Sequence, residues 1–174
     1  SIILEPVSRN TAPAIALAAL KAQKFNKKNQ LLLILSADHI IEDSNSLRES
    51  ILNAHKYAYE GRLITFGITP YYPETGFGYI EASEELSNKN NSSSIKKFIE
   101  KPNKELAEKL IKNKLYTWNS GIFLFKASKI IEEISLHNPQ IIKLCKESIK
   151  EEIYDLEFQR INEDKFKQCP DISI

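Results

Sequence analysis

The chain has 174 residues, and its 24 lysines and arginines nearly balance its 23 aspartates and glutamates, giving a net charge of +1. This length suits one ordinary domain with a hydrophobic core, and the balanced charge argues against nucleic acid as a partner. No stretch approaches the roughly twenty apolar residues of a membrane span. The two cysteines, Cys145 and Cys169, belong to no metal-binding motif, so a reducing, cytoplasmic setting fits best.

The first predicted helix is an alanine-rich run from Ile15 to Phe25. Pro13 is tolerated only in a first helical turn, so we expect the helix to begin just before it, with Asn10 or Thr11 as cap. A helix amino end carries unpaired backbone N–H groups and favours an anionic ligand, and Arg9 could add a donor there. Considered alone, Glu5 and Arg9 are better explained as solvated loop charges.

A continuous apolar run, Leu31–Leu35, is followed by Ser36, Ala37, Asp38 and His39. The run predicts a strand of a parallel sheet that is buried on both faces. Ligands of open α/β sheets bind beyond the carboxyl ends of such strands, which is where Asp38 would lie. The alternative is that Asp38 only caps a turn.

A second helix is predicted from a capping box that starts at Ser46, and it runs to about Tyr59, with Gly61 ending it. The apolar stretch Leu63–Ile68 then predicts another buried strand. A strand, a helix and a strand in this order favour a right-handed parallel crossover.

The segment 69–80 is rich in proline, glycine and aromatic residues. Gly76 and Gly78 flank an aromatic residue and let the backbone come close to a bound molecule. Aromatic rings with free backbone amides suit a sugar or a base. An ordinary hairpin with a glycine bulge would leave the same pattern.

A strand predicted over Ile95–Glu100 ends in a carboxylate and an ammonium group side by side. Glu100 can accept hydrogen bonds from sugar hydroxyls, and Lys101 can bind phosphate as a point charge. A surface ion pair of little energetic value is the alternative. Asn103 is expected to cap a short helix that follows, through Ile111.

A polar and aromatic turn, Tyr116–Gly121, is predicted to lead into a strand over Ile122–Phe125. Asn119 has two donors and one acceptor and could read vicinal hydroxyls, whereas Trp118 is expected to pack in the core. Beyond Lys126 the chain looks helical, with a break at Asn138-Pro139.

Together, five motifs resemble, in order and spacing, the nucleotidyltransferase domain of the mannose-1-phosphate guanylyltransferases, or GDP-mannose pyrophosphorylases. The motifs are EPVSRNTAPAIALA, LSADHII, TFGITPYYPETGFGYIEA, FIEKPN and YTWNSGIFLF. The resemblance covers nearly the whole chain and implies an α/β, Rossmann-like nucleotidyltransferase fold, with a mostly parallel central sheet and helices on both faces. Residues 1–174 would form one partial nucleotidyltransferase domain.

The resemblance implies transfer of GMP from GTP to mannose 1-phosphate, which yields GDP-mannose and pyrophosphate. In the matching motifs, Asp38 would hold Mg²⁺ and act with Lys101 as a catalytic residue. The residues matching the guanine pocket are Glu5, Arg9, Asn10, Thr11 and Ala12. Those matching the mannose and phosphate side are Gly76, Gly78, Tyr79, Glu100, Lys101 and Asn119. A homo-oligomer and a parent enzyme that is also a mannose-6-phosphate isomerase are both compatible with the resemblance.

The chain also departs from the family pattern. Ser36 stands where proline is usual, and Phe77 where tyrosine is common. The glycine-rich triphosphate signature is expected upstream of Ser1, and a second metal-binding aspartate directly after Ile174. We therefore expect a fragment truncated at both ends that is inactive when isolated. The alternatives are a non-catalytic sugar-nucleotide-binding module and a pyrophosphorylase for another sugar nucleotide.

Overall fold

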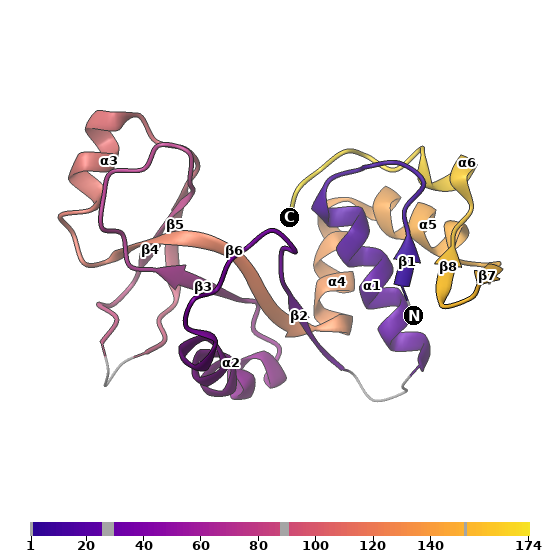
Figure 1. Cartoon of the computed structure of the whole chain (residues 1–174), viewed down its shortest axis with the longest axis horizontal. Coiled ribbons are helices and arrows are strands. Elements are labelled where there is room, and N and C mark those ends of the chain that lie inside the picture. Colours follow the sequence, from indigo (N-terminus) through magenta and orange to yellow (C-terminus); the bar gives the residue numbers. More distant parts are fainter. Residues whose placement is uncertain (1, 26–29, 88–90, 152) are drawn as a thin grey trace. The chain divides into compact units, whose positions relative to one another are not determined.

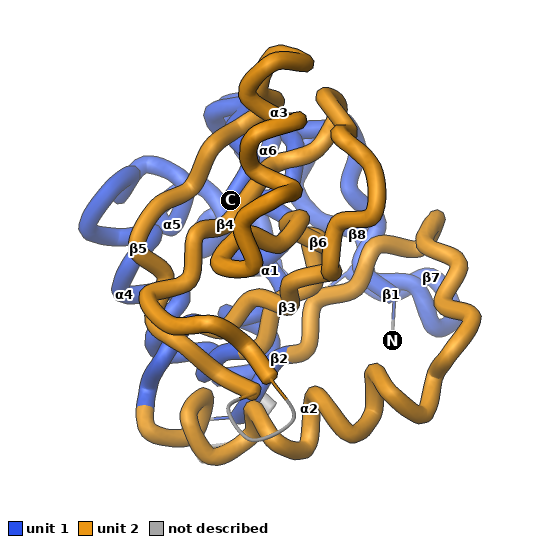
Figure 2. The backbone as a smooth tube through the Cα atoms, turned by 90° about the vertical axis from the view of Figure 1, so that its left-hand side faces the viewer, with its two compact units in different colours: residues 1–32, 61–63, 125–174 blue, residues 33–60, 64–124 orange. Residues whose placement is uncertain are grey.

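The structure is a computed structural model that describes residues 2–25, 30–87, 91–151 and 153–174. The chain divides into two compact units, which Figure 2 shows in different colours. Unit 1 contains Ser1–Leu32, Gly61–Leu63 and Phe125–Ile174, and unit 2 contains Leu33–Glu60 and Ile64–Leu124. The prediction of a single domain over residues 1–174 stays a prediction.

In its described residues, unit 1 combines four helices with a three-stranded sheet in the order β1-β8-β7 (Figure 1). Its elements are β1 (Ile2–Leu4), α1 (Thr11–Phe25), α4 (Ala127–His137), α5 (Pro139–Ser148), β7 (Ile153–Asp155), β8 (Phe158–Arg160) and α6 (Glu163–Phe166). Helix α1 packs against α4 and α5, and α5 packs against α6. Small residues of α1, Ala16 and Ala19 among them, are fully buried, which lets the helices approach closely.

Two predictions for unit 1 are confirmed and one is wrong. Helix α1 begins at Thr11 with Pro13 in its first turn, and Pro139 is the first residue of α5 after the break at Asn138. The chain beyond Lys126 is not helical throughout, because β7 and β8 form an antiparallel pair. Strand β8 also pairs in parallel with β1, a contact between distant segments that local periodicity does not reveal.

Unit 2 is built on a five-stranded sheet in which β6 pairs with β2, β3 and β4, and β4 pairs with β5. Its elements are α2 (Ser44–Tyr59), β3 (Ile64–Ile68), β4 (Tyr79–Ala82), β5 (Ile95–Ile99) and α3 (Lys104–Leu110); β2 (Leu31–Ile34) and β6 (Tyr116–Lys126) each straddle the boundary with unit 1. Ala107 and Leu110 of α3 pack with Tyr79 and Trp118 in a buried cluster. The prediction that Trp118 packs in the core is therefore confirmed.

The α/β class is confirmed, but the expected parallel order of the sheet is not. The registered pairs β3·β6, β4·β5 and β4·β6 are all antiparallel. Strand β6 pairs with both β2 and β3, so these two strands are joined through β6 and no described pair joins them directly. The predicted right-handed parallel crossover from β2 through α2 to β3 stays a prediction. The sequence pattern of β2, α2 and β3 gives no sign that β6, a strand much later in the chain, pairs with both β2 and β3.

Strand β2 is shorter and more exposed than its apolar sequence predicts. Leu33 is 38% exposed and Leu35, beyond the strand, is 49% exposed. The prediction of burial on both faces is wrong for the described chain, where β2 stands at one end of the strand order.

Helix boundaries in unit 2 agree closely with the sequence, with one change of cap. The α2 cap is Asp43, whose carboxylate accepts hydrogen bonds from the backbone N–H of Ser46 at 2.9 Å and from its hydroxyl at 2.6 Å. Ser46 is thus bound by the cap and is not the cap itself. Gly61 follows the helix with a φ of +94°, and the Asn103 side chain caps α3 as predicted.

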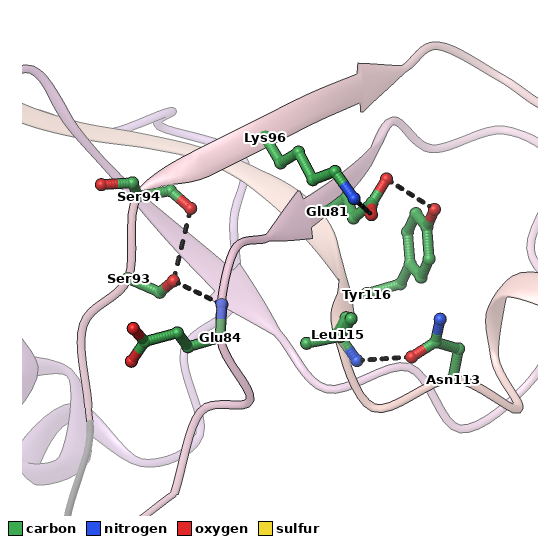
Figure 3. Close-up of polar contacts among 8 residues, drawn as sticks. All are labelled: Glu81, Glu84, Ser93, Ser94, Lys96, Asn113, Leu115 and Tyr116. Carbon is green, nitrogen blue, oxygen red and sulfur yellow. Dashed lines mark hydrogen bonds and ion pairs between the residues drawn. The ribbon is translucent and has the colours of Figure 1, made fainter.

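Polar contacts of Glu81 join β4 to its two neighbouring strands, β5 and β6 (Figure 3). Glu81 lies in β4 opposite Tyr116 of β6, whose hydroxyl donates to its carboxylate at 2.8 Å. Lys96, the extra residue at a bulge in β5, forms an ion pair with the same carboxylate at 3.0 Å. The Tyr116 hydrogen bond and then the Lys96 ammonium lower the pKa of Glu81. This contact ties β4 to both neighbours at the end of the strand remote from Gly78.

The lowered pKa of Glu81 predicts that its contribution to stability is lost in acid. Because the folded state favours the ionised form, this contribution is present above the ordinary glutamate pKa and disappears as the pH falls through the lowered value. Glu81→Gln should therefore be less stable than the wild type near pH 7, and the gap should shrink below about pH 4. Urea unfolding at both pH values measures this, and a gap independent of pH would contradict it.

Candidate functional site

The predicted site residues fall into two sets, one in each unit. Unit 2 contains Asp38, Gly76, Gly78, Tyr79, Glu100, Lys101 and Asn119, and unit 1 contains Glu5, Arg9, Asn10, Thr11 and Ala12.

In unit 2, strand pairing brings Gly78, Glu100 and Asn119 together. Tyr79 is opposite Ile99 of β5 and Trp118 of β6, so the residues next to it in each strand become neighbours. The backbone N–H of Asn119 donates to the carbonyl of Gly78 at 2.8 Å. These three residues come from distant parts of the sequence and meet at one end of three paired strands.

Gly78 is a position where a side chain would displace its neighbours. A Cβ atom there would lie 2.6 Å from Cζ of Phe98 and 3.0 Å from Oε2 of Glu100. The carboxylate of Glu100 therefore lies directly beside the Gly78 backbone, and glycine leaves the room for it.

Lys101 follows Glu100 in a strained backbone conformation. Its φ of +42° lies in the left-handed region, which long side chains rarely adopt. Its ammonium lies 3.5 Å from the Glu100 carboxylate, and both side chains are more than half exposed. Such an exposed pair adds little to stability, so the strain is not explained by the ion pair. The Lys101 ammonium and the Glu100 carboxylate are both exposed to solvent, so a ligand can contact both.

The loop before β4 is folded by its own contacts. The carboxylate of Glu74 accepts the Gly76 N–H at 2.7 Å, and this bond is the main reason why the pKa of Glu74 is lowered. The carbonyl of Glu74 accepts the Tyr79 hydroxyl at 2.8 Å. The Gly76 amide is thus not free for a ligand, and Tyr79, with no exposed surface, supports the strand from the core side.

Aromatic rings of the loop before β4 pack around Trp118 of β6. The rings of Tyr71, Tyr72 and Phe77 each meet Trp118 edge to face, with centroids 5.2, 4.9 and 5.5 Å away. The indole N–H of Trp118 is buried without a hydrogen-bond partner. The three outer residues are exposed, Tyr71 most of all at 82%, while Trp118 beneath them is buried.

The segment around Asn119 is part of a strand and not the turn that its sequence predicts. Strand β6 runs unbroken from Tyr116 to Lys126, but its pairing with β3 shifts, so that Thr65 is opposite Phe123 and Gly67 is opposite Asn119. The extra residues form a bulge in which Gly121 has a φ of +70°. Polar residues and glycine are typical both of turns and of bulges, and a bulge beside a site redirects side chains.

Asp38 lies in an exposed turn four residues after β2. The next residue, His39, reaches the β6 bulge, because a Cβ atom at Gly121 would lie 4.0 Å from Cε1 of its ring. The turn with Asp38 is thus near the bulge with Asn119. Among the described residues no group of three His, Cys, Asp or Glu side chains could hold a metal. Asp38 offers a single hard oxygen ligand, which fits an ion that takes its other ligands from phosphates and water.

In unit 1, the residues at the start of α1 bind the chain's own last segment. The Ala12 N–H donates to the Ile172 carbonyl at 3.0 Å, and the Ile174 N–H donates to the Thr11 hydroxyl oxygen at 3.0 Å. The Thr11 N–H is taken by the side chain of Asn10, whose φ is +62°. Pro13 has no N–H, so the expectation of several unpaired donors at this helix end is wrong.

The charges of Glu5 and Arg9 affect the pKa of a buried cysteine, Cys169. The Sγ atoms of Cys145 and Cys169 are 4.0 Å apart, and burial raises the pKa of both thiols. The positive charge of Arg9 lowers the pKa of Cys169, and the negative charge of Glu5 raises it. Arg9 donates to the Lys167 carbonyl, while its Nε is buried without a partner. Glu5 is largely at the surface, yet the surrounding protein removes enough water to raise its pKa.

The family model described as nucleotidyl transferase matches residues 1–164. The chain belongs to the nucleotidyl transferase family. This nucleotidyl transferase chain is 50% identical to a mannose-1-phosphate guanylyltransferase of Salmonella montevideo and 43% identical to one of Escherichia coli K12. The alignments cover 99% and 100% of the chain but only 37% of each relative.

Two solved structures share the fold of this nucleotidyl transferase. A mannose-6-phosphate isomerase from Helicobacter pylori has a TM-score of 0.82 and 35% identity, and covers 98% of the chain and 64% of that protein. A protein from Thermus thermophilus, described as a mannose-1-phosphate geranyltransferase, has a TM-score of 0.80 and 30% identity, with coverages of 98% and 47%. None of the described helices is long and apolar enough to cross a membrane.

The bulge makes a testable prediction at Gly121. Its positive φ is a backbone requirement, and a Cβ atom there would make only an ordinary contact, 4.0 Å from Cε1 of His39, so Gly121→Ala should lower the free energy of unfolding by about 1–2 kcal/mol through backbone strain. Gly121→Asn should cost less despite its larger side chain, because asparagine tolerates left-handed conformations. Urea unfolding of both variants measures the order. A larger loss for asparagine would show that space and not backbone conformation is limiting.

Proposed function

We propose that this chain is the sugar- and guanine-binding part of a mannose-1-phosphate guanylyltransferase. The proposed reaction transfers GMP from GTP to mannose 1-phosphate and gives GDP-mannose and pyrophosphate. The assembly of Gly78, Glu100 and Asn119 at one end of β4, β5 and β6 is the main structural support. The identity to enzymes of that name supports the choice of substrates.

In the proposed site, hydrogen bonds would hold the sugar and a positive charge would hold the phosphate. Glu100, an acceptor, would take hydrogen bonds from sugar hydroxyls, and the exposed ammonium of Lys101 would bind the phosphate. The Asn119 amide would donate to a sugar oxygen. Together these contacts would hold the ligand's phosphate ready to react, which is how phosphoryl-transfer enzymes obtain most of their rate.

In the proposed step, a phosphate oxygen of mannose 1-phosphate attacks the α-phosphorus of GTP in line. The new P–O bond forms as the bond to the bridging oxygen breaks, and that oxygen leaves with pyrophosphate. Asp38 would be the carboxylate ligand of a Mg²⁺ ion, which would supply neutralisation of phosphate charge when bound. Lys101 would stabilise the charge of the incoming phosphate in the same way.

For the nucleotide, we propose that Glu5 accepts hydrogen bonds from the guanine N–H groups and that Arg9, Asn10, Thr11 and Ala12 line its pocket. The raised pKa of Glu5 supports a carboxylate that is partly removed from water, a setting where charge-assisted hydrogen bonds are strong. The buried Cys145 and Cys169, whose Sγ atoms lie 4.0 Å apart as free thiols, support a reducing, cytoplasmic setting. The name of the Helicobacter pylori relative supports a bifunctional parent with isomerase activity.

Lys101→Met tests the sugar phosphate site in the longest product of the gene. Loss of the ammonium should raise KM for mannose 1-phosphate roughly tenfold or more, because the phosphate loses its point charge, while KM for GTP stays within about twofold. Lys104→Met, which removes another exposed lysine three residues away, is the matched control and should change neither constant. Release of pyrophosphate from GTP measures both.

The same assay separates the alternatives. Preference for UTP or dTTP, or for glucose 1-phosphate, would contradict the guanine and mannose assignments and indicate another sugar-nucleotide pyrophosphorylase. Binding of the sugar nucleotide without any turnover in the gene product would indicate a non-catalytic binding module. We expect residues 1–174 on their own to release no pyrophosphate.

A further inference from the structure

The side chain of Asn119 is held at its oxygen end and open at its nitrogen end. Its Oδ1 atom lies 3.4 Å from the backbone N–H of Gly121 and 3.0 Å from the hydroxyl of Thr65. Within the described residues its Nδ2 group donates no hydrogen bond to the protein, and the residue is only partly buried.

These contacts decide which way the amide faces. A backbone N–H can only donate, so the Asn119 atom that meets Gly121 must be the oxygen. A carbonyl oxygen can only accept, so the Thr65 hydroxyl must be the donor in the second contact. The Gly121 contact therefore sets the orientation, and the Thr65 hydroxyl, which can donate or accept, is compatible with it as a donor. The NH₂ group is then turned away from the Thr65 hydroxyl.

Thr65 is well placed to keep this orientation. It lies in β3 opposite Phe123, just before the register shift, and its hydroxyl also lies 3.2 Å from the carbonyl of Ile122. A β-branched side chain has few χ1 rotamers, so strand pairing fixes where its hydroxyl points. The hydroxyl carries a single proton, so the two acceptor oxygens share it, and the shorter contact is the one to Asn119.

We propose that Thr65 is a positioning residue that turns the Asn119 amide so that its two N–H groups face the sugar phosphate. This rests on the proposed function, because it assigns the ligand of that amide. It adds a constraint on the ligand: the group at this point must present an acceptor oxygen. A freely rotating amide could meet a donor or an acceptor equally well, whereas this one is committed to donate.

Calorimetric titration of the chain with mannose 1-phosphate tests the proposal. Thr65→Val keeps the shape but removes the hydroxyl, and it should weaken binding roughly three- to tenfold, as expected for one lost hydrogen bond. Thr65→Ser keeps the donor and should bind within about twofold of the wild type. Thr117→Val removes a hydroxyl from the same sheet, two residues before Asn119, and should also bind within about twofold.

A double-variant cycle separates positioning from general support of the sheet. If Thr65 acts through the Asn119 amide, Thr65→Val should weaken binding no further once Asn119→Ala has removed that amide. The Asn119 side-chain NH₂ resonances of the free chain should move in Thr65→Val and stay in place in Thr117→Val. If Thr65→Val weakened binding by the same factor in the wild type and in the Asn119→Ala variant, the proposal would be overturned.

The outcomes also separate this proposal from the proposed function. Wild-type binding that Thr65→Val leaves unchanged would overturn the role of Thr65 alone. No binding of mannose 1-phosphate by the wild type, with all variants folded, would overturn the proposed sugar site and this role with it. Rescue by serine together with a lost effect in the Asn119→Ala background would establish the role.

Discussion

Strand β4 is paired on both sides, and the position of every polar residue at the candidate sugar site depends on that double pairing. Tyr79 is opposite Ile99 on one side and Trp118 on the other. A shift of one residue in either pair would turn Glu100 or Asn119 to the opposite face of the sheet. The buried Tyr79 and the contact of Glu81 with Tyr116 and Lys96 resist such a shift from the core and from the far end of the strand.

Irregular backbone occurs at both candidate sites. Of the three residues other than glycine with positive φ in the described chain, Asn10 and Lys101 are predicted site residues. Gly121, with its own positive φ, forms the bulge beside Asn119. Strain of this kind persists only when the surrounding structure enforces it, and it is common at binding sites. The regular strands thus fix the register, and the irregular residues at their ends set the direction of the side chains.

The sequence predicts helices better than it predicts the sheet. The start of α1, the break at Pro139 and the cap of α3 depend on local chemistry and are confirmed. The antiparallel course of β6 and the pairing of β1 with β8 depend on contacts between distant segments, which local patterns do not contain.

The site shows the same division. Glu100, Lys101 and Asn119 could be chosen from their motifs, but Thr65 could not, because a threonine inside an apolar strand carries no local sign of its contact with Asn119. The expectation of unpaired donors at the amino end of α1 is wrong for a similar reason: the Ala12 N–H donates to the carbonyl of Ile172, far along the chain. Partners that lie far apart in the sequence become visible only when the strands and helices are placed.

Backbone amide chemical shifts of the chain, followed during titration with mannose 1-phosphate, test the central claim most directly. The account predicts that the largest changes occur at residues 76–79, 100–101 and 119–121, and that strand β7 in unit 1 changes little. Changes that are absent from these three segments, or larger at β7 than at them, would contradict a sugar phosphate site at the ends of β4, β5 and β6.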